Sequence, residues 1–290
     1  MVRQTKSSRK MTVRPLDEGD VGRGVELCRA AGWNQCADDW RVLLSVRSGC
    51  CFAAEREGIV VGTAAALRYG TQVGWVGMLL VDAAHRRQGV GTGLLTAALG
   101  ALEGCRSVGL DATPEGRPLY EKNGFRPVCG VIRLRLGRGI RYVDVSGGRI
   151  RPMRREDLGA VVAADESACG LHRPEMAAAY FRSAPDCAHV AIEADGRIGG
   201  FVLGRPGHEW AQMGPLTAGD GDTARMLAGA CLQRLGGRGI LTDVPEGRSD
   251  WRQRLCEAGF REQRTFCRMV RGDALPAWDR VFSIAGPEWG

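Results

Sequence analysis

The residues with the clearest chemical signature form a glycine-rich segment that joins two apolar patterns. Residues 75–81 are an apolar run typical of a buried strand, and leucines at helical spacing over residues 89–102 predict a helix. The first N–H groups of a helix have no intrahelical acceptor, and the helix dipole favours negative charge beside them. We therefore expect a pyrophosphate site here, with Arg86 or Arg87 adding positive charge. The surrounding residues would be Gln88, Gly89, Val90, Gly91, Thr92 and Gly93.

A dinucleotide-binding fold would explain the same glycines, because Asp111 lies 20 residues after Gly91, where a ribose-binding acid belongs. Two details oppose this alternative. Its fingerprint needs a glycine directly after the strand, whereas seven residues separate Val81 from Gly89. It also needs a third glycine where this chain has Leu94. The spacing therefore favours a different phosphate loop.

The chain repeats itself, beginning at an offset of 137 residues. Val-Arg-Pro at 13–15 recurs as Ile-Arg-Pro at 150–152, and Pro-Glu-Gly-Arg at 114–117 recurs at 245–248. We therefore expect a duplication, in which a disordered basic tail over residues 1–10 precedes a first domain over 11–137. A linker over 138–148 and a second domain over 149–290 would follow.

The hydrophobic periodicity predicts alternating strands and helices in the first half. We expect strands at residues 12–15, 52–55, 60–68, 75–81 and 108–112. Helices are expected at residues 20–31, 89–102 and 118–122. The fold class is therefore mixed α/β.

The composition narrows the class of protein. Of 290 residues, 44% are hydrophobic and 25% are charged, and no apolar run approaches the ~20 residues of a membrane helix. The net charge of +7 falls to +3 without the four basic residues of the tail, and the other arginines are scattered, which argues against nucleic acid. The 11 cysteines include no Cys-x-x-Cys pair and the four histidines are isolated, so we expect no metal site. We expect a cytoplasmic monomer or homodimer that binds neither nucleic acid nor membrane.

Two motifs in the first half carry a family resemblance. Val81 with Arg86-x-x-Gly89-x-Gly91, followed by Leu-Tyr-Glu-Lys at 119–122 and Gly-Phe at 124–125, resembles the GCN5-related N-acetyltransferase (GNAT) superfamily over residues 11–136. Segments at 31–35, 39–40 and 282–288 resemble a tandem subgroup with a divergent second domain. The resemblance implies tandem GNAT folds, each a mixed, mostly antiparallel sheet flanked by helices, with a splayed central strand pair.

The resemblance also implies acetyl-CoA as the cosubstrate. The pantetheine arm would enter where the 75–81 strand splays from the 108–112 strand, and would pair with the backbone near Leu80 and Val81. Tyr120 would be the general acid beside the departing sulfur. Because a phenol with a pKa of about 10 is a weaker acid than a thiol near 8.5, a hydrogen bond to the thiolate is as plausible as complete proton transfer. The alternative is an interior tyrosine that packs a short helix.

The base that deprotonates the acceptor is not evident in the sequence. Many relatives place a glutamate on the strand before the loop, whereas residues 77–80 here are Gly, Met, Leu and Leu. Asp111 is the candidate base or ammonium anchor, with a structural capping role as the alternative. Asn34 and Gln35 lie in the region that commonly lines the acceptor pocket, and they either orient a polar acceptor or stabilise a turn.

The second half has lost the phosphate loop. Residues 217–225 are about five residues shorter than the first copy and carry Asp220 and Asp222, which would repel a pyrophosphate. Leu255 replaces the tyrosine as well. We therefore expect a noncatalytic second domain that completes the fold or walls the acceptor pocket, with Asp243 and Trp210 as candidate contacts to the acceptor.

The preferred hypothesis is an acetyl-CoA-dependent N-acetyltransferase that transfers the acetyl group directly to a small-molecule amine in a ternary complex. The missing base and the degenerate second copy leave another hypothesis open, a noncatalytic acyl-CoA sensor or interaction protein. Turnover separates the two, because only the first consumes acetyl-CoA when an amine is supplied.

Overall fold

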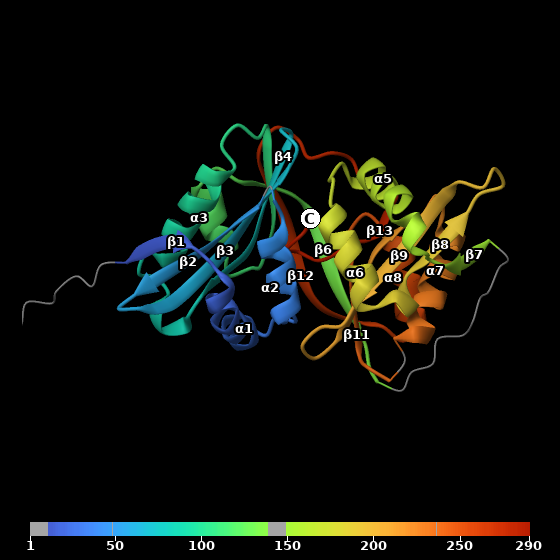
Figure 1. Cartoon of the computed structure of the whole chain (residues 1–290), viewed down its shortest axis with the longest axis horizontal. Helices are drawn as coiled ribbons and strands as arrows, with labels where there is room; N and C mark the ends of the chain where they lie inside the picture. Colours follow the sequence, from blue (N-terminus) through green and yellow to red (C-terminus); the bar gives the residue numbers. More distant parts are fainter. Residues whose placement is uncertain (1–10, 48, 139–148, 236) are drawn as a thin grey trace, which may run out of the picture.

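The computed structural model describes residues 11–47, 49–138, 149–235 and 237–290 (Figure 1). The basic tail expected at residues 1–10 and nearly all of the expected linker, residues 139–148, lie outside the described residues. In Figure 1 the two halves of the sequence lie side by side, with the C-terminus between them. The C-terminal residues are thus placed where they can contact both halves.

The first half alternates strands and helices much as the periodicity predicts, with an additional helix, α2. Most bounds agree within about three residues. The elements are β1 (Thr12–Pro15), α1 (Val21–Ala30), α2 (Ala37–Ser45), β2 (Gly49–Arg56), β3 (Ile59–Tyr69), β4 (Val73–Val81), α3 (Val90–Ala101), β5 (Ser107–Ala112), α4 (Arg117–Lys122) and β6 (Arg126–Leu136).

The second half repeats this order and adds one short strand at its end. Its elements are β7 (Ile150–Pro152), α5 (Leu158–Cys169), α6 (Pro174–Ser183), β8 (His189–Ile192), β9 (Ile198–Arg205), β10 (Ala211–Thr217), α7 (Gly221–Arg234), β11 (Ile240–Pro245), α8 (Ser249–Glu257), β12 (Arg261–Gly272) and β13 (Val281–Ser283). The class is mixed α/β with mostly antiparallel pairing, as expected.

The last long strand of each half lies in the sheet of the other half. The strand order runs β1-β2-β3-β4-β5-β12-β6-β11-β10-β9-β8-β7, so β12 separates β5 from β6, and β6 pairs with β11. These pairs are antiparallel, with Arg268 opposite Asp111 and Arg133 opposite Asp243. The two sequence halves therefore form one continuous sheet rather than two independent ones.

Two reciprocal ion pairs fix the exchanged strands. Arg268 on β12 donates two hydrogen bonds of 2.8 Å to Asp111 on β5. Arg133 on β6 donates bonds of 2.7 and 2.8 Å to Asp243 on β11. All four side chains are buried. Because a shift of the exchanged strand would leave both buried charges of its pair without a partner, each pair favours the observed register.

The sheet has an apolar layer on each face. Alternate residues of β3 face opposite ways, so that Ala65 and Leu67 join the cluster containing α1 and α2 while Ala64 and Ala66 face α3. The first of these clusters continues without a break into α5 and α6, where it contains Met176. The halves thus share a core on this face, consistent with one cooperative structure.

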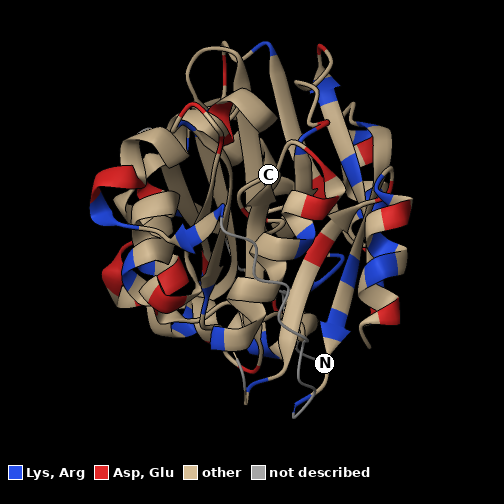
Figure 2. Ribbon diagram, turned by 90° about the vertical axis from the view of Figure 1, so that its right-hand side faces the viewer, with Lys and Arg blue, Asp and Glu red and all other residues tan. Residues whose placement is uncertain are grey.

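The surface charges, the length of the helices and the positions of the titratable side chains bear on the expectations about nucleic acid, membranes and metals. Figure 2 shows acidic and basic residues interspersed over the elements in view. Within the described residues, no helix is long and apolar enough to cross a membrane. No group of three or more His, Cys, Asp or Glu residues within the same ranges could hold a metal ion.

Candidate active site

The central strands β4 and β5 pair only at one end. Their parallel register begins at Val73 with Ser107 and ends at Trp75 with Gly109, although β4 continues to Val81. Met78 bends the strand, because its φ of 51° is left-handed, and its carbonyl accepts a 2.9 Å hydrogen bond from the Thr63 hydroxyl. The splayed strand pair expected in the first half is therefore confirmed.

The loop after β4 leads into an uncapped helix. Gly89 is the N-cap of α3 with a φ of 83°, and no described side chain accepts from the first N–H groups of the helix. A Cβ at Gly89 would meet no atom within 4 Å, so the space beside these groups is open. This end of α3 can accept a pyrophosphate without displacing a side chain, which fits acetyl-CoA.

The charged residues of the loop are exposed and partly fixed. Arg86 Nε donates to the Val81 carbonyl at 3.2 Å, and Gln88 Nε2 donates to the Ala84 carbonyl at 2.9 Å. Arg87 has a left-handed φ of 60° and is also exposed. The loop therefore presents two guanidinium groups to solvent beside the start of α3. Of the predicted phosphate-binding residues, Val90 is instead buried in the core, and a Cβ at Gly93 would lie 2.7 Å from Met11.

The loop is continuous with the gap between β4 and β5. A Cβ at Gly91 would lie 3.4 Å from Leu119 and within 4 Å of Val81 and Leu79. Leu79 in turn lines a cavity in the splayed region. A ligand extending from α3 along β4 would thus reach that cavity.

The cavity is built from both halves of the chain. The first half contributes Trp33, Gln35, Val76, Gly77, Met78, Leu79, Asp111, Tyr120 and Arg133, and the second contributes Phe266, Pro287 and Glu288. Of the sequence-predicted site residues, it brings together Gln35, Asp111 and Tyr120. The expectation that the second half walls the pocket agrees with this lining, although different residues do so.

Tyr120 on α4 has both an interior face and a face on the cavity. Its side chain is 8% exposed, and its ring meets Phe125 edge-on at 5.9 Å between centroids. Burial raises the pKa of the phenol well above its ordinary value. A phenol that holds its proton this firmly is suited to donate a hydrogen bond to a developing thiolate rather than to give up the proton completely.

Asp111 borders the cavity, but both oxygens of its carboxylate are engaged in an ion pair. Both oxygens accept from Arg268, whose guanidinium also lies over the rings of Trp278 and Trp75 at 3.8 and 4.7 Å. An ion pair of this geometry favours the structural alternative for Asp111, because protonation would break the contact that holds β12. Its role as the base remains a prediction without geometric support.

Asn34 connects the two halves. Its side chain accepts from the backbone N–H groups of Glu209 and Trp210 and donates to the Trp210 carbonyl at 2.9 Å. The Trp210 ring packs at Gly239, where a Cβ would lie 2.3 Å from it. Asn34 and Trp210 are thus joined to each other, outside the set that lines the cavity. This geometry agrees with the turn-stabilising alternative for Asn34.

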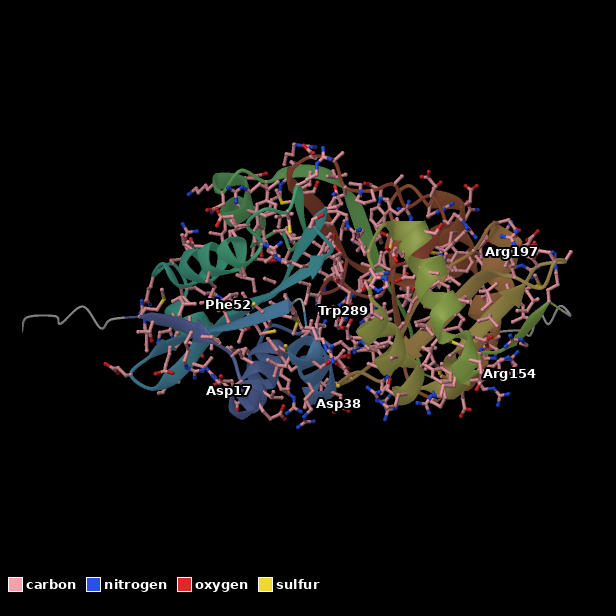
Figure 3. All side chains as sticks on the ribbon, turned by 45° about the horizontal axis from the view of Figure 1, so that its top comes forward. Asp17, Asp38, Phe52, Arg154, Arg197 and Trp289 are labelled. Atoms are coloured by element: carbon pink, nitrogen blue, oxygen red, sulfur yellow. The ribbon has the colours of Figure 1, made fainter. Side chains whose placement is uncertain are left out.

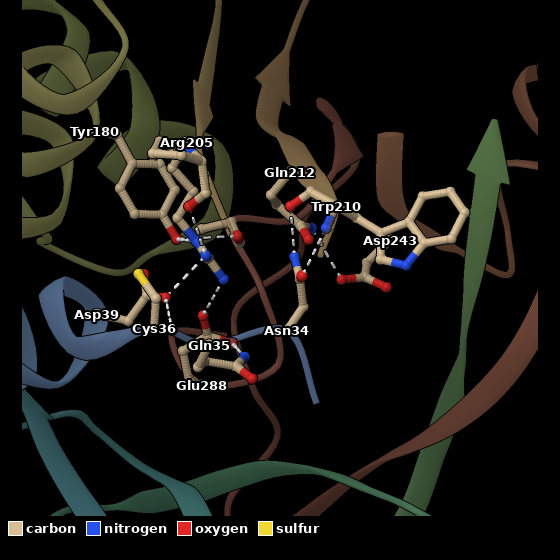
Figure 4. A network of polar contacts seen from close by, with 12 residues as sticks. Asn34, Gln35, Cys36, Asp39, Tyr180, Arg205, Trp210, Gln212, Asp243 and Glu288 are labelled. Carbon is tan, nitrogen blue, oxygen red and sulfur yellow. Dashed lines mark hydrogen bonds and ion pairs between the residues drawn. The ribbon is translucent and has the colours of Figure 1, made fainter. Parts of the chain in front are cut away.

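Asp243 also lies outside the lining set, and its side chain is fully buried. Its oxygens accept from Arg133. One of them also accepts from Gln212 at 3.1 Å (Figure 4). These bonds occupy the positions that an acceptor would need. The structure therefore gives this carboxylate a role in strand exchange, while acceptor contact stays an unsupported prediction.

Sequence reasoning missed Glu288 as a site residue. Glu288 lines the cavity and accepts a 2.9 Å hydrogen bond from Gln35, and its other oxygen is 3.2 Å from Arg205 (Figure 4). A signal was present, because the first half has no carboxylate on β4 and the C-terminal residues extend beyond the repeat. Gln35 and Glu288 are 253 positions apart in the sequence, so no local pattern indicates that they are in contact.

The corresponding place in the second half is closed. The helix α7 is capped by Asp220, whose carboxylate accepts from the Thr223 N–H at 2.7 Å. Strand β13 lies in the gap between β10 and β11. It pairs with Leu216 and Thr217 of β10, and the Ile284 N–H donates to the backbone carbonyl of Asp243 on β11. The chain's own groups thus occupy both the phosphate position and the strand gap.

Comparisons with known proteins agree with this geometry. Two family models, each described as an acetyltransferase (GNAT) domain, match residues 47–127 and 161–283. The chain is 26% identical over 249 residues to an uncharacterised N-acetyltransferase of Bacillus subtilis, YitH, covering 84% of this chain and 86% of that protein. It is 28% identical over 216 residues to the holothin acyltransferase of Pseudoalteromonas sp. (strain SANK 73390), covering 73% and 71%.

A similar fold is found in a crystal structure of a proposed acetyltransferase from Pyrococcus horikoshii. The TM-score is 0.81 at 21% identity, over 100% of this chain and 99% of that one. The likeness thus includes the second half as well as the first. With one matching domain model in each half, the chain belongs to the GNAT superfamily of acetyltransferases and carries two GNAT domains in tandem.

Proposed function

We propose that the chain is an acetyl-CoA-dependent N-acetyltransferase that transfers the acetyl group directly to a small-molecule amine. The observation that carries this proposal is the continuity of three features in the first half. The uncapped N-terminus of α3, the unpaired edge of β4 and the cavity beside Tyr120 follow one another along the same side of the sheet. They match the three parts of an acyl-CoA, namely pyrophosphate, pantetheine arm and thioester.

Each part of the site has a chemical task in this proposal. The N–H groups at the start of α3 bind the pyrophosphate, and Arg86 and Arg87 offset its charge. The backbone near Leu80 and Val81 binds the pantetheine arm as an added strand. Acetyl-CoA, when bound, supplies an activated thioester. Tyr120 donates a hydrogen bond to the sulfur as the C–S bond breaks.

The walls of the cavity support a small acceptor. A cavity lined by side chains of both halves suits a small molecule better than an extended polypeptide. Direct transfer needs the amine and the thioester in this space together. None of the described residues that line it is a cysteine that could carry the acyl group, which supports a ternary complex.

Release of CoA thiol by the full chain tests the proposal. Acetyl-CoA is offered with a panel of amino acid amides, polyamines and aminoglycosides, and propionyl-CoA replaces it in a parallel series. We expect amine-dependent thiol release with at least one acceptor, and mass spectrometry should show an acetamide product. Failure of the chain to bind acetyl-CoA in a calorimetric titration would overturn the proposal. Binding without turnover of any amine would favour the sensor hypothesis.

A further inference from the structure

The C-terminal residues run from the second half into the active-site cavity of the first. This C-terminal segment, residues 284–290, first passes Gly214 on β10, where a Cβ would lie 2.2 Å from the Ile284 carbonyl. It then passes Gly77 on β4, 137 positions before Gly214 in the repeat, where a Cβ would lie 3.0 Å from the Glu288 backbone. At both strands the missing side chain leaves room for this segment.

Hydrogen bonds hold the segment in place. The Trp75 indole donates to the Pro287 carbonyl at 2.9 Å, and the Tyr69 hydroxyl donates to the Trp289 carbonyl at 2.9 Å. Arg173 donates to the Gly290 carbonyl at 2.6 Å. Trp289 is itself buried, and Figure 3 shows it near the middle of the molecule. The Glu288 carboxylate thus arrives on a rigid support beside the part of β4 that carries no carboxylate of its own.

The buried charges around Glu288 are one cation short. Arg205 is shared between Asp39 at 2.9 Å and Glu288 at 3.2 Å, and all three side chains are at most 6% exposed (Figure 4). Arg133, the guanidinium that lines the cavity, is already paired with Asp243. With both carboxylates ionised, the Arg205 group carries a net charge of −1. A buried charge of this kind requires a proton or a cationic partner.

Gln35 provides a second, independent sign of a missing ligand. Its Nε2 donates to Glu288, but its Oε1 is buried and has no hydrogen-bond partner among the described residues. Gln35 is 4% exposed and lines the cavity. The cavity therefore presents an unused amide oxygen next to an undercompensated carboxylate. Both groups accept hydrogen bonds, and a primary ammonium supplies donors and charge together.

We propose that Glu288, with Gln35 Oε1, binds the ammonium form of the acceptor and accepts its proton before acetyl transfer. This inference rests on the proposed function and names a base contributed by the second half. The Glu288 carboxylate takes one proton from R–NH₃⁺, leaving the neutral amine. The amine nitrogen forms a C–N bond to the thioester carbonyl carbon and the C–S bond breaks. The second amine proton goes to the sulfur, assisted by Tyr120, and Glu288 returns its proton to solvent.

The surroundings of Glu288 make its carboxylate a stronger base than an exposed one. Burial raises its pKa, Arg205 and Arg133 oppose this effect, and Asp39 adds to it. The other titratable groups that interact with it are Cys28, Tyr69 and Tyr180. A carboxylate with a raised pKa binds a proton more tightly and is therefore a better base. Activity should therefore increase as pH rises through this pKa, and the variant lacking the carboxylate should lose that dependence.

The test uses the full chain with two small amines of different basicity. n-Propylamine is almost fully protonated at pH 7, whereas 2,2,2-trifluoroethylamine is almost fully neutral and needs no base. E288Q should lower kcat/KM for n-propylamine by about 100- to 10,000-fold, and that for trifluoroethylamine by less than about tenfold. D20N is the control, because it removes a largely buried carboxylate from Arg14 on β1, and neither Asp20 nor Arg14 lines the cavity.

Binding supplies a readout that needs no turnover. Calorimetry of the CoA complex with n-propylammonium chloride should show affinity in the unaltered chain and in D20N, and a loss of at least about tenfold in E288Q. Equal affinity in E288Q, absence of binding to the unaltered chain, or equal losses for both amines would overturn the role of Glu288. Failure of the unaltered chain to bind acetyl-CoA would instead overturn the proposed function.

Discussion

The helices α3 and α7 begin at equivalent places in the two halves, yet their N-terminal groups meet different partners. At α3 the N-cap is Gly89, and no described side chain accepts from the first N–H groups. At α7 the N-cap is Asp220, whose carboxylate accepts from Thr223. An aspartate cap stabilises a helix through the same donors that would bind a phosphate. One helix end is thus available to a ligand, and the other is satisfied internally.

The strand gaps differ in the same way. Between β4 and β5 the first half leaves a cavity, whereas between β10 and β11 the second half inserts β13. The C-terminal residues beyond β13 then contribute Glu288 to the cavity of the first half. The second half therefore has the same order of elements as the first, but its helix end and its strand gap are occupied. We propose that it contributes to catalysis through its C-terminal segment, which carries Glu288.

The largest expected effect comes from a charge placed at the open helix. G91E puts a carboxylate beside the pyrophosphate, and like-charge contact costs several kcal/mol, so the Kd for acetyl-CoA should rise by at least about a thousandfold. G221E, at the start of α7, is the matched control and should leave this Kd unchanged. Calorimetry measures both. Similar losses in the two variants would erase the distinction between the helices.

The hydroxyl of Tyr120 should matter less than the phosphate site. Y120F preserves the ring beside Phe125, and we expect kcat to fall by about ten- to a thousandfold, with little change in the KM for acetyl-CoA. The loss should shrink for an acyl donor with a more acidic leaving thiol. Steady-state kinetics and a thermal melt provide the readouts. An unchanged kcat, where chemistry limits turnover, would make Tyr120 a packing residue like its counterpart Leu255.

The smallest effect concerns the cap of α7. D220A should destabilise the chain by about 1 kcal/mol at pH 7 and should create no second acetyl-CoA site, because β13 still fills the gap. Hydrogen bonding to Thr223 lowers the pKa of Asp220 in the folded chain. The cap therefore stabilises fully above the unfolded value of about 3.9 and is lost as pH falls through the folded value. Urea melts at pH 7 and pH 3 should show the difference between the two chains shrinking. A constant difference would contradict the capping role.

The local parts of the site could be predicted from the sequence. The apolar run of β4, the loop and the helix α3 are contiguous, so their patterning fixes their order and nearly their bounds. The aspartates that replace the loop in the second half were equally visible, and Asp220 does lie at the helix start. These predictions depend on contacts within about twenty residues.

The long-range parts could not be predicted in this way. The patterns of β6 and β12 fit either half, and their exchange depends on Arg133 and Arg268 meeting aspartates of the opposite half. The position of Glu288 depends in turn on β13 and on the bonds from Trp75 and Tyr69. Periodicity reports which side of a strand is apolar and does not identify its partner.

Amide hydrogen exchange with and without acetyl-CoA compares the two helix ends most directly. The N–H groups that open α3 have no acceptor in the free chain and should exchange quickly, and a bound pyrophosphate should slow them. We predict slower exchange over residues 88–94 on addition of acetyl-CoA, with no change over residues 219–225. Slowing at both segments, at the second alone or at neither would contradict the claim that only the first half retains an acyl-CoA site.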